Sequence, residues 1–281
     1  MNDSPPRLAS KAQGQDPTAS APRVAVISGA ANGIGWATAK LMAGNSWRVA
    51  LLDMDDSALR DRAAQLGPQH IGLVCDVTDA AEVNAAFGVA RSTLGRVDAL
   101  INCAGISDQT GPTLEQSIEA FDRVLAVHLR GSFLMMQAAL RAMLTQSRDE
   151  YGNRGSIVNL GSIASLGGIP GRNAYSAAKA GIVGMTRTLA SEWAREGVRV
   201  NTVAPGYVRT QMVDHLERQG AINGGFIAHR TPMGRIADPD EIAQVIAFLA
   251  SPVSSYVTGA VLPVDGGWSA FGASESTLPA L

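Results

Sequence analysis

The sequence has few of the residues that cross-link a protein or bind metal ions. Among 281 residues there are two cysteines, Cys75 and Cys103. Each lies in an apolar run, so we expect two buried, reduced thiols and no disulfide framework. The four histidines show no metal-ligand spacing with one another or with the cysteines. We therefore expect no metal site.

Long apolar runs and an excess of one charge are also lacking. No stretch reaches the roughly 18 uninterrupted apolar residues that a membrane span needs, so we expect no membrane partner. The net charge of -2 gives no electrostatic basis for binding nucleic acid. Residues 1–22 are rich in Pro, Ser, Ala and Gln and lack the apolar core of a secretory signal. We predict a disordered tail there, and a cytoplasmic protein by default.

From Arg23 onward, short apolar runs alternate with longer amphipathic segments. A chain with 46% hydrophobic residues suits one globular domain with a large core. The apolar runs predict strands at 24–27, 48–52, 71–75, 97–102, 156–160, 198–203 and 261–264. The amphipathic segments predict helices at 34–43, 57–66, 80–94, 114–146 with a break near Gln116, 174–196 and 240–250.

The predicted strands are apolar on both faces, which indicates parallel strands covered by helical crossovers. The expected fold class is α/β: a single-domain, doubly wound (Rossmann) parallel seven-stranded sheet with helices on both faces. We assign residues 23–268 to a cofactor-binding catalytic domain and 269–281 to a C-terminal tail. Residues 211–235 show no strong periodicity and are predicted to form a loop or lid over the substrate.

A glycine-rich turn follows the first predicted strand and opens the first helix. It reads Ser28-Gly29-Ala30-Ala31-Asn32-Gly33-Ile34-Gly35. Glycines there let the backbone turn tightly and approach a pyrophosphate, which lies against the helix N-terminus. The turn alone is also compatible with a plain strand-to-helix connection, but its position between strand and helix favours a dinucleotide site.

Asp53 ends the second predicted strand, 18 positions after Gly35 (53 minus 35). A carboxylate there can accept hydrogen bonds from the adenosine ribose hydroxyls. It would repel the extra phosphate of NADP, by about 4 kcal/mol at ~4 Å and an effective dielectric constant of ~20. No Arg or Lys lies in the turn or immediately after Asp53, so NAD is the predicted cofactor.

Several motifs in one order make the chain resemble the short-chain dehydrogenase/reductase family. They are the glycine turn, Asn102-Cys103-Ala104-Gly105, Ser162, Tyr175-Ser176-Ala177-Ala178-Lys179, Pro205-Gly206 and Asp265-Gly266-Gly267. The resemblance covers about residues 23–268. It implies an NAD-dependent oxidoreductase of CH–OH groups and a homotetramer that packs the helices at 123–146 and 174–196 against a neighbouring subunit.

The chemistry of Tyr175 and Lys179 can also be argued from the residues. Alcohol oxidation by hydride transfer requires removal of the hydroxyl proton, and a tyrosinate can accept it. Lys179 lies on the same helix face four residues later, so its ammonium can favour the phenolate. Ser162 follows the fifth strand, where its hydroxyl can hold the substrate oxygen. Without the other motifs, such a pair would be an ordinary surface pair.

The resemblance also implies the cofactor contacts. Lys179 would bind the nicotinamide ribose, Asp76 and Val77 would flank the adenine, and Val208 and Thr210 would hold the carboxamide end. The full expected set is Gly29, Asn32, Gly33, Ile34, Gly35, Asp53, Asp76, Val77, Asn102, Ala104, Gly105, Tyr175, Lys179, Pro205, Gly206, Val208 and Thr210.

The chain departs from the family pattern at His128. The family has a catalytic Asn there, which bends its helix so that a backbone carbonyl holds a water of the proton relay. A histidine can keep that backbone role, or its imidazole can titrate and carry protons itself. We include His128 among the catalytic residues and favour the backbone role.

The substrate is a secondary alcohol or ketone, and polar residues near the predicted site favour a polyol, sugar or small hydroxy compound. These residues are Asp108, Gln109, Arg172, Asn173 and Gln211. An alternative is a 3-hydroxyacyl or 3-oxoacyl thioester or a steroid. An alternative of another class is a catalytically silent NAD-binding regulator on the same fold.

Overall fold

One parallel sheet forms the centre of the computed structural model, which describes residues 22–218, 220 and 222–273. The strands are β1 (Val24–Ser28), β2 (Arg48–Asp53), β3 (Ile71–Val74), β4 (Ala99–Asn102), β5 (Gly155–Leu160), β6 (Val198–Pro205) and β7 (Val261–Val264). Their order is β3-β2-β1-β4-β5-β6-β7, and every neighbouring pair is parallel. The predicted fold class is confirmed. The predicted tail at 1–22, apart from Pro22, lies outside the described residues.

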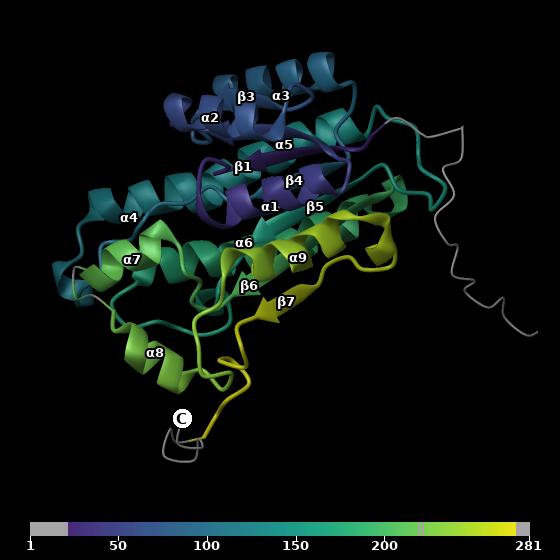
Figure 1. Ribbon diagram of the computed structural model, residues 1–281. Helices are drawn as coiled ribbons and strands as arrows, with labels where there is room; N and C mark the ends of the chain where they lie inside the picture. The colour runs from purple at the N-terminus through teal and green to yellow at the C-terminus, as the bar shows by residue number, and fades with distance from the viewer. Residues whose placement is uncertain (1–21, 219, 221, 274–281) are drawn as a thin grey trace, which may run out of the picture.

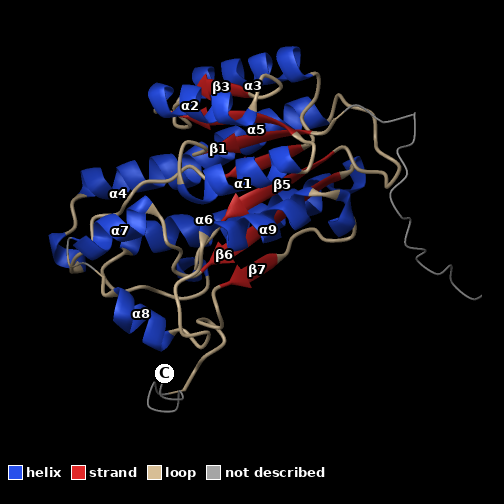
Figure 2. Ribbon diagram, viewed as in Figure 1, coloured by secondary structure: helices blue, strands red, loops and turns tan. Residues whose placement is uncertain are grey.

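Helices cover both faces of the sheet (Figure 2). They are α1 (Gly33–Gly44), α2 (Asp56–Leu66), α3 (Ala80–Leu94), α4 (Ile118–Leu125), α5 (Ser132–Met143), α6 (Asn173–Trp193), α7 (Gln211–Arg218), α8 (Gly224–Arg230) and α9 (Pro239–Ala250). One apolar core joins α3, α5 and α6 to the sheet, and a second joins α1, α2 and α9 to the other face. Strands β1, β4, β5 and β6 are wholly buried, as parallel strands between two helical layers must be.

Two predicted segments differ from the structure. The helix predicted at 114–146 does break near Gln116, but a π-helical segment, Ala126–Gly131, interrupts it again between α4 and α5. The 211–235 segment, predicted as a loop or lid, contains the short helices α7 and α8. Helices of 8 and 7 residues span about two turns, too few for a clear period in the sequence.

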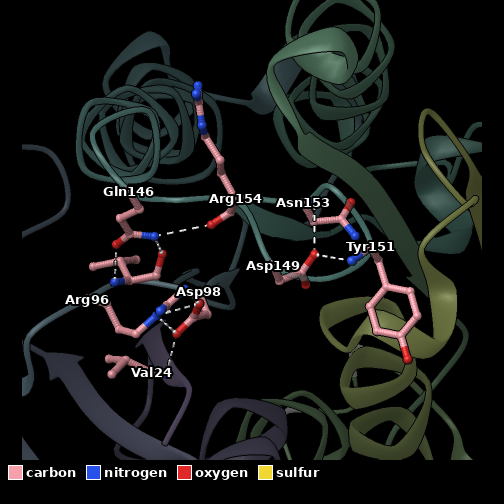
Figure 3. A network of polar contacts seen from close by, with 9 residues as sticks. Val24, Arg96, Asp98, Gln146, Asp149, Tyr151, Asn153 and Arg154 are labelled. Atoms are coloured by element: carbon pink, nitrogen blue, oxygen red, sulfur yellow. Dashed lines mark hydrogen bonds and ion pairs between the residues drawn. The ribbon is translucent and has the colours of Figure 1, made fainter. Parts of the chain in front are cut away.

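The two ends of the sheet differ: polar contacts close the amino ends of the strands, and the carboxyl ends face α7 and α8. At the amino ends of the strands, Asp98 accepts a hydrogen bond from the backbone of Val24 (2.9 Å) and pairs with Arg96 (2.6 Å). Gln146 donates to the carbonyl of Arg154 (3.2 Å) beside this pair (Figure 3). These contacts close the amino end, while α7 and α8 lie beyond the carboxyl ends of the strands (Figure 1). Open α/β sheets bind ligands at that carboxyl edge.

Candidate active site

The turn between β1 and α1 is shaped for close backbone approach. Gly29 and Gly33 have φ of 63° and 55°, in the left-handed region that favours glycine. A Cβ on Gly35 would lie 2.1 Å from the carbonyl oxygen of Gly29, so only glycine fits there. Asn32 makes no side-chain cap, and the first turn of α1 has no acidic residue. The helix therefore presents free N–H donors and a positive dipole end to an anion.

A pocket of about 410 Å³ opens from this turn across the carboxyl ends of the strands. It brings together fifteen of the residues predicted for the site. They are Gly29, Asn32, Gly33, Ile34, Gly35, Asp53, Gly105, His128, Ser162, Tyr175, Lys179, Pro205, Gly206, Val208 and Thr210. Its size and its combination of a phosphate turn with titratable groups fit a dinucleotide and a small substrate.

Four predicted contacts do not line this pocket. Asn102 is buried below it and donates to Asn159 (2.8 Å), while its own Oδ1 has no partner among the described residues. Ala104 contacts the glycine turn through its backbone N–H, which donates to Ser28 Oγ (3.2 Å). Asp76 accepts from the backbone of Thr78 (2.8 Å) and, like the neighbouring Val77, lies off the pocket wall.

Six further residues line the pocket that the predicted set left out. They are Cys103, Leu160, Gly161, Gln211, Met212 and Val213. Three of them belong to α7, and Gln211 reaches the glycine turn through Asn32 (3.4 Å). In the sequence Gln211 stands out only as polar, and its place beside the turn shows that α7 borders the cofactor pocket.

Asp53 is held by the backbone of the glycine turn. One carboxylate oxygen accepts from the N–H of Ala31 (3.1 Å), and the other accepts from Met54 (2.8 Å). Arg62 of α2 also reaches the turn: its Nε donates to the carbonyl of Ala31 (3.0 Å), and its guanidinium lies 4.8 Å from the Trp36 ring. A cation that offsets the repulsion between Asp53 and the extra phosphate of NADP is expected in the glycine turn or just after Asp53. Arg62 lies in neither of these two stretches.

Ser162, Tyr175 and Lys179 meet where β5 ends against α6. Ser162 caps a short 3-10 turn, and its hydroxyl accepts from the backbone N–H of Ala164 (3.1 Å) beside Tyr175. Burial raises the pKa of Tyr175, while the Ser162 hydrogen bond and the nearby Arg172 charge lower it. Lys179 donates to the carbonyl of Leu160 (2.6 Å), which fixes its ammonium beneath the tyrosine.

Lys179 is buried, and burial lowers its pKa to about 8. Its Nζ lies 5.6 Å from the centre of the Tyr175 ring, whereas the guanidinium carbon of Arg172 lies 4.2 Å away. The sequence spacing points only to Lys179 as the cation for Tyr175. The structure adds a second cation, closer to the same ring.

His128 lies in the π-helical segment and packs its ring edge-on against Tyr175 (5.3 Å between centres). Its Nε2 lies 2.9 Å from the carbonyl oxygen and 3.1 Å from the amide nitrogen of Ile106, and Nδ1 is buried without a partner in the described part of the chain. Burial lowers the pKa of His128 to about 3, so the imidazole is neutral at physiological pH. Its backbone carbonyl accepts from Ser132 Oγ (2.7 Å).

The described residues contain no group of three or more His, Cys, Asp or Glu side chains placed to hold a metal ion. Nor is any helix in the described part of the chain long and apolar enough to cross a membrane.

Comparison with known proteins places this geometry among oxidoreductases. The family model described as enoyl-(acyl carrier protein) reductase matches residues 29–269. D-threitol dehydrogenase of Mycolicibacterium smegmatis is 41% identical over 250 residues, covering 88% of this chain and 93% of the relative. Cis-4-hydroxycyclohexanecarboxylate dehydrogenase of Sinomonas cyclohexanicum is 41% identical over 254 residues, covering 89% and 98%.

Two other matches extend the comparison. An uncharacterised short-chain type dehydrogenase/reductase of Sinorhizobium fredii is 42% identical over 246 residues, and this chain spans only 43% of its length. The crystal structure of a substituted actinorhodin polyketide ketoreductase with NADPH superposes with a TM-score of 0.82 at 32% identity, covering 89% of this chain and 98% of that one.

Proposed function

Because the chain belongs to the short-chain dehydrogenase/reductase family, we propose that it oxidises a secondary alcohol reversibly to a ketone with NAD(H). One observation carries the proposal: Ser162, Tyr175 and Lys179 line the same pocket as the glycine turn. A silent NAD-binding regulator would not need a buried lysine beside a tyrosine there, because burying a charged group costs free energy.

The residues fit the roles that this reaction requires. The glycine turn and the N-terminus of α1 would bind the pyrophosphate of the cofactor, and Asp53 would accept hydrogen bonds from its adenosine ribose. NAD, when bound, would supply the hydride acceptor and a positive charge. Ser162 Oγ holds the substrate oxygen, and Tyr175 takes its proton. Lys179 would hold the nicotinamide ribose, while Ser162 and the charge of Arg172 lower the pKa of Tyr175 against the rise that burial imposes.

His128 acts through its shape in this proposal. A ring with a pKa of about 3 is uncharged at working pH, and its Nε2 is already engaged by Ile106. It holds the loop after β4 against α6 and supports the Tyr175 ring. The π-helical segment around it supplies the helix distortion that the resemblance implies for this position.

NAD is the proposed cofactor because the carboxylate of Asp53 lines the pocket. We expect catalytic efficiency with NAD to exceed that with NADP by at least ~10-fold, since a tenfold difference needs only ~1.4 kcal/mol of the like-charge repulsion. Two findings favour the rival cofactor: Arg62 beside the glycine turn, and the NADPH in the related ketoreductase structure. Equal use of both cofactors by the wild type would overturn the assignment.

A small polyol, sugar or hydroxy compound is the proposed substrate class, which the threitol and hydroxycyclohexanecarboxylate dehydrogenases support by similarity. The description of the family model and the polyketide ketoreductase favour acyl substrates as the second candidate. A panel of diols, sugar alcohols, hydroxy acids and 3-hydroxyacyl thioesters, followed by NADH absorbance, separates the two. Cytoplasmic location stays a prediction of the sequence.

Tyr175→Phe tests the mechanism. The variant keeps the ring packing but loses the proton acceptor, so turnover should fall by about 10²–10⁴-fold while NAD affinity is unchanged. Tyr207→Phe is the matched control, because Tyr207 also lies near the site and packs on Trp268 (5.3 Å). Tyr207→Phe should retain activity. Retention of most activity in Tyr175→Phe would contradict the mechanism.

A further inference from the structure

Arg172 is a cation whose hydrogen-bonding groups are unused. It is the residue before α6 and lies three positions ahead of Tyr175. Its guanidinium carbon lies 4.2 Å from the centre of the Tyr175 ring. Its Nε and Nη2 atoms are buried without a partner, and within the described residues the guanidinium makes no hydrogen bond or ion pair.

Burying charged donors without a partner costs free energy, and native structures rarely accept that cost without a use for the group. Arg172 as a whole is half-buried, while its Nε and Nη2 atoms are buried beside the Tyr175 ring. Stacking on an aromatic ring engages the flat face of a guanidinium and leaves the N–H donors in its own plane. Those donors form a fork that matches the two oxygens of a carboxylate.

The other charges around Tyr175 are already engaged. Asp108 accepts from the backbone N–H of Tyr175 (3.1 Å), and Lys179 donates to the carbonyl of Leu160 (2.6 Å). Within the described residues Asp108 makes no ion pair with Arg172, although both lie beside the same tyrosine. Among the charged groups beside Tyr175 in the described part of the chain, Arg172 is therefore the one whose hydrogen-bond donors have no partner.

We propose that Arg172 binds a carboxylate of the substrate, so that the alcohols which this enzyme oxidises are hydroxy acids. The inference rests on the proposed function, because it takes Tyr175 as the group that faces the reacting carbinol. The guanidinium and the phenol ring are in contact, so only a few carbon atoms separate the carboxylate from the carbinol. Small hydroxy acids fit this spacing, and long acyl chains bound through a distant head group do not.

The neighbouring surface suits the carbon skeleton of such an acid. The loop before Arg172 lines a second cavity of about 250 Å³ through Ile163, Leu166 and Ile169, with Trp268 and Phe271 opposite. Most of these side chains are apolar, although Arg230 and Ser269 also line the cavity, and Arg172 provides a charged group at the end of the same loop. A substrate with an apolar body and one anionic end satisfies both surfaces.

The test compares an acid with its neutral amide. Wild-type enzyme is assayed with 3-hydroxybutyrate and 3-hydroxybutyramide, and with 4-hydroxycyclohexanecarboxylate and its carboxamide. Loss of a charged hydrogen-bonded pair changes affinity by about 10- to 100-fold. For whichever of the two acids is the better substrate, we expect kcat/KM to be about tenfold or more higher than for the corresponding amide. Arg172→Gln should remove that preference by raising KM for the acid, and Arg172→Lys should restore part of it.

Arg187→Gln is the matched control. Arg187 is exposed on α6, the helix that carries Tyr175, and it lines neither cavity. Its replacement should leave the ratio of acid to amide unchanged. Arg172→Gln should fold, since the Arg172 side chain makes no capping hydrogen bond to α6. If Arg172→Gln does not fold, the ratio of kcat/KM for acid and amide in the wild type and in Arg172→Lys still tests the inference.

Calorimetric binding of cyclohexanecarboxylate and cyclohexanecarboxamide to the enzyme with NADH gives a readout that needs no turnover. Tighter binding of the carboxylate, lost in Arg172→Gln, supports the inference even if no alcohol is oxidised and the proposed function fails. Oxidation of neutral diols with no preference for acids overturns the inference and leaves the proposed function standing. An equal fall in kcat for acid and amide in Arg172→Gln, with a shifted alkaline limb, overturns it too, because Arg172 would then act only on Tyr175.

Discussion

Replacing His128 with asparagine tests how a buried neutral imidazole responds to acid. The folded-state pKa of His128 is lowered from 6.5 to about 3, mainly by burial and further by the charge of Lys179. Above pH 6.5 the ring is neutral in both the folded and the unfolded chain, so His128 adds no pH dependence. Between pH 6.5 and about pH 3, the unfolded chain binds a proton that the folded chain does not bind.

The free energy of unfolding therefore falls as the pH drops, by about 1.4 kcal/mol per pH unit from this one group. From about pH 6.5 to about pH 5 the loss is about 2 kcal/mol. Asparagine has no titratable group, so His128→Asn should lose this part of the acid sensitivity. The free energy of unfolding of His128→Asn at neutral pH will differ from that of the wild type because the packing changes. We therefore compare how much the free energy of unfolding of each protein changes with pH.

The measurement is urea unfolding followed by circular dichroism at pH 7 and pH 5, at one protomer concentration. His229→Asn is the control, because it makes the same substitution at a histidine that is exposed on α8. The buried His70, whose pKa is also lowered by burial, keeps some acid sensitivity in all three proteins. Equal pH dependence in wild type and His128→Asn would refute a neutral, buried His128.

The pH dependence of activity separates the two roles of His128. With a neutral ring, His128→Asn should keep kcat within a few-fold and retain the wild-type acid-side limb. A hundredfold loss together with disappearance of that limb would show that the imidazole carries protons.

Other contacts in the structure lead to three more predictions. Asp53→Ala should lower the ratio of kcat/KM with NAD to kcat/KM with NADP. Adding Arg62→Ala should then reduce the activity with NADP that the first substitution gained. An unchanged ratio in Asp53→Ala would contradict the role of Asp53 at the adenosine ribose. Gly105→Ala places a Cβ 2.5 Å from Cε1 of His128, so a loss of about 1–3 kcal/mol in unfolding free energy is expected by chemical denaturation. Light scattering should show a homotetramer, or failing that a dimer, that survives deletion of residues 2–18; a stable monomer at assay concentration contradicts this.

Much of the site follows from short stretches of sequence. The glycine turn needs only its own backbone conformation and the strand and helix on either side. Tyr175 and Lys179 share a helix face because four residues make about one turn. The seven strands follow from runs that are apolar on both faces, since only a sheet covered on both sides buries them. These features depend on residues that are close in the sequence, so a periodic sequence pattern is enough to predict them.

The tertiary structure decided what depends on residues far apart in the chain. Arg62 reaches the glycine turn from α2, 31 positions after Ala31, and nothing in the spacing marks that approach. His128 is neutral because the packed chain excludes water from its ring, and the sequence left its protonation open. Arg172 is one of several polar residues near the site, and only packing places its guanidinium on the Tyr175 ring with donors left unpaired among the described residues. Burial and unmet hydrogen bonds are properties of the packed chain, so they set the electrostatics of this site where a local pattern could not.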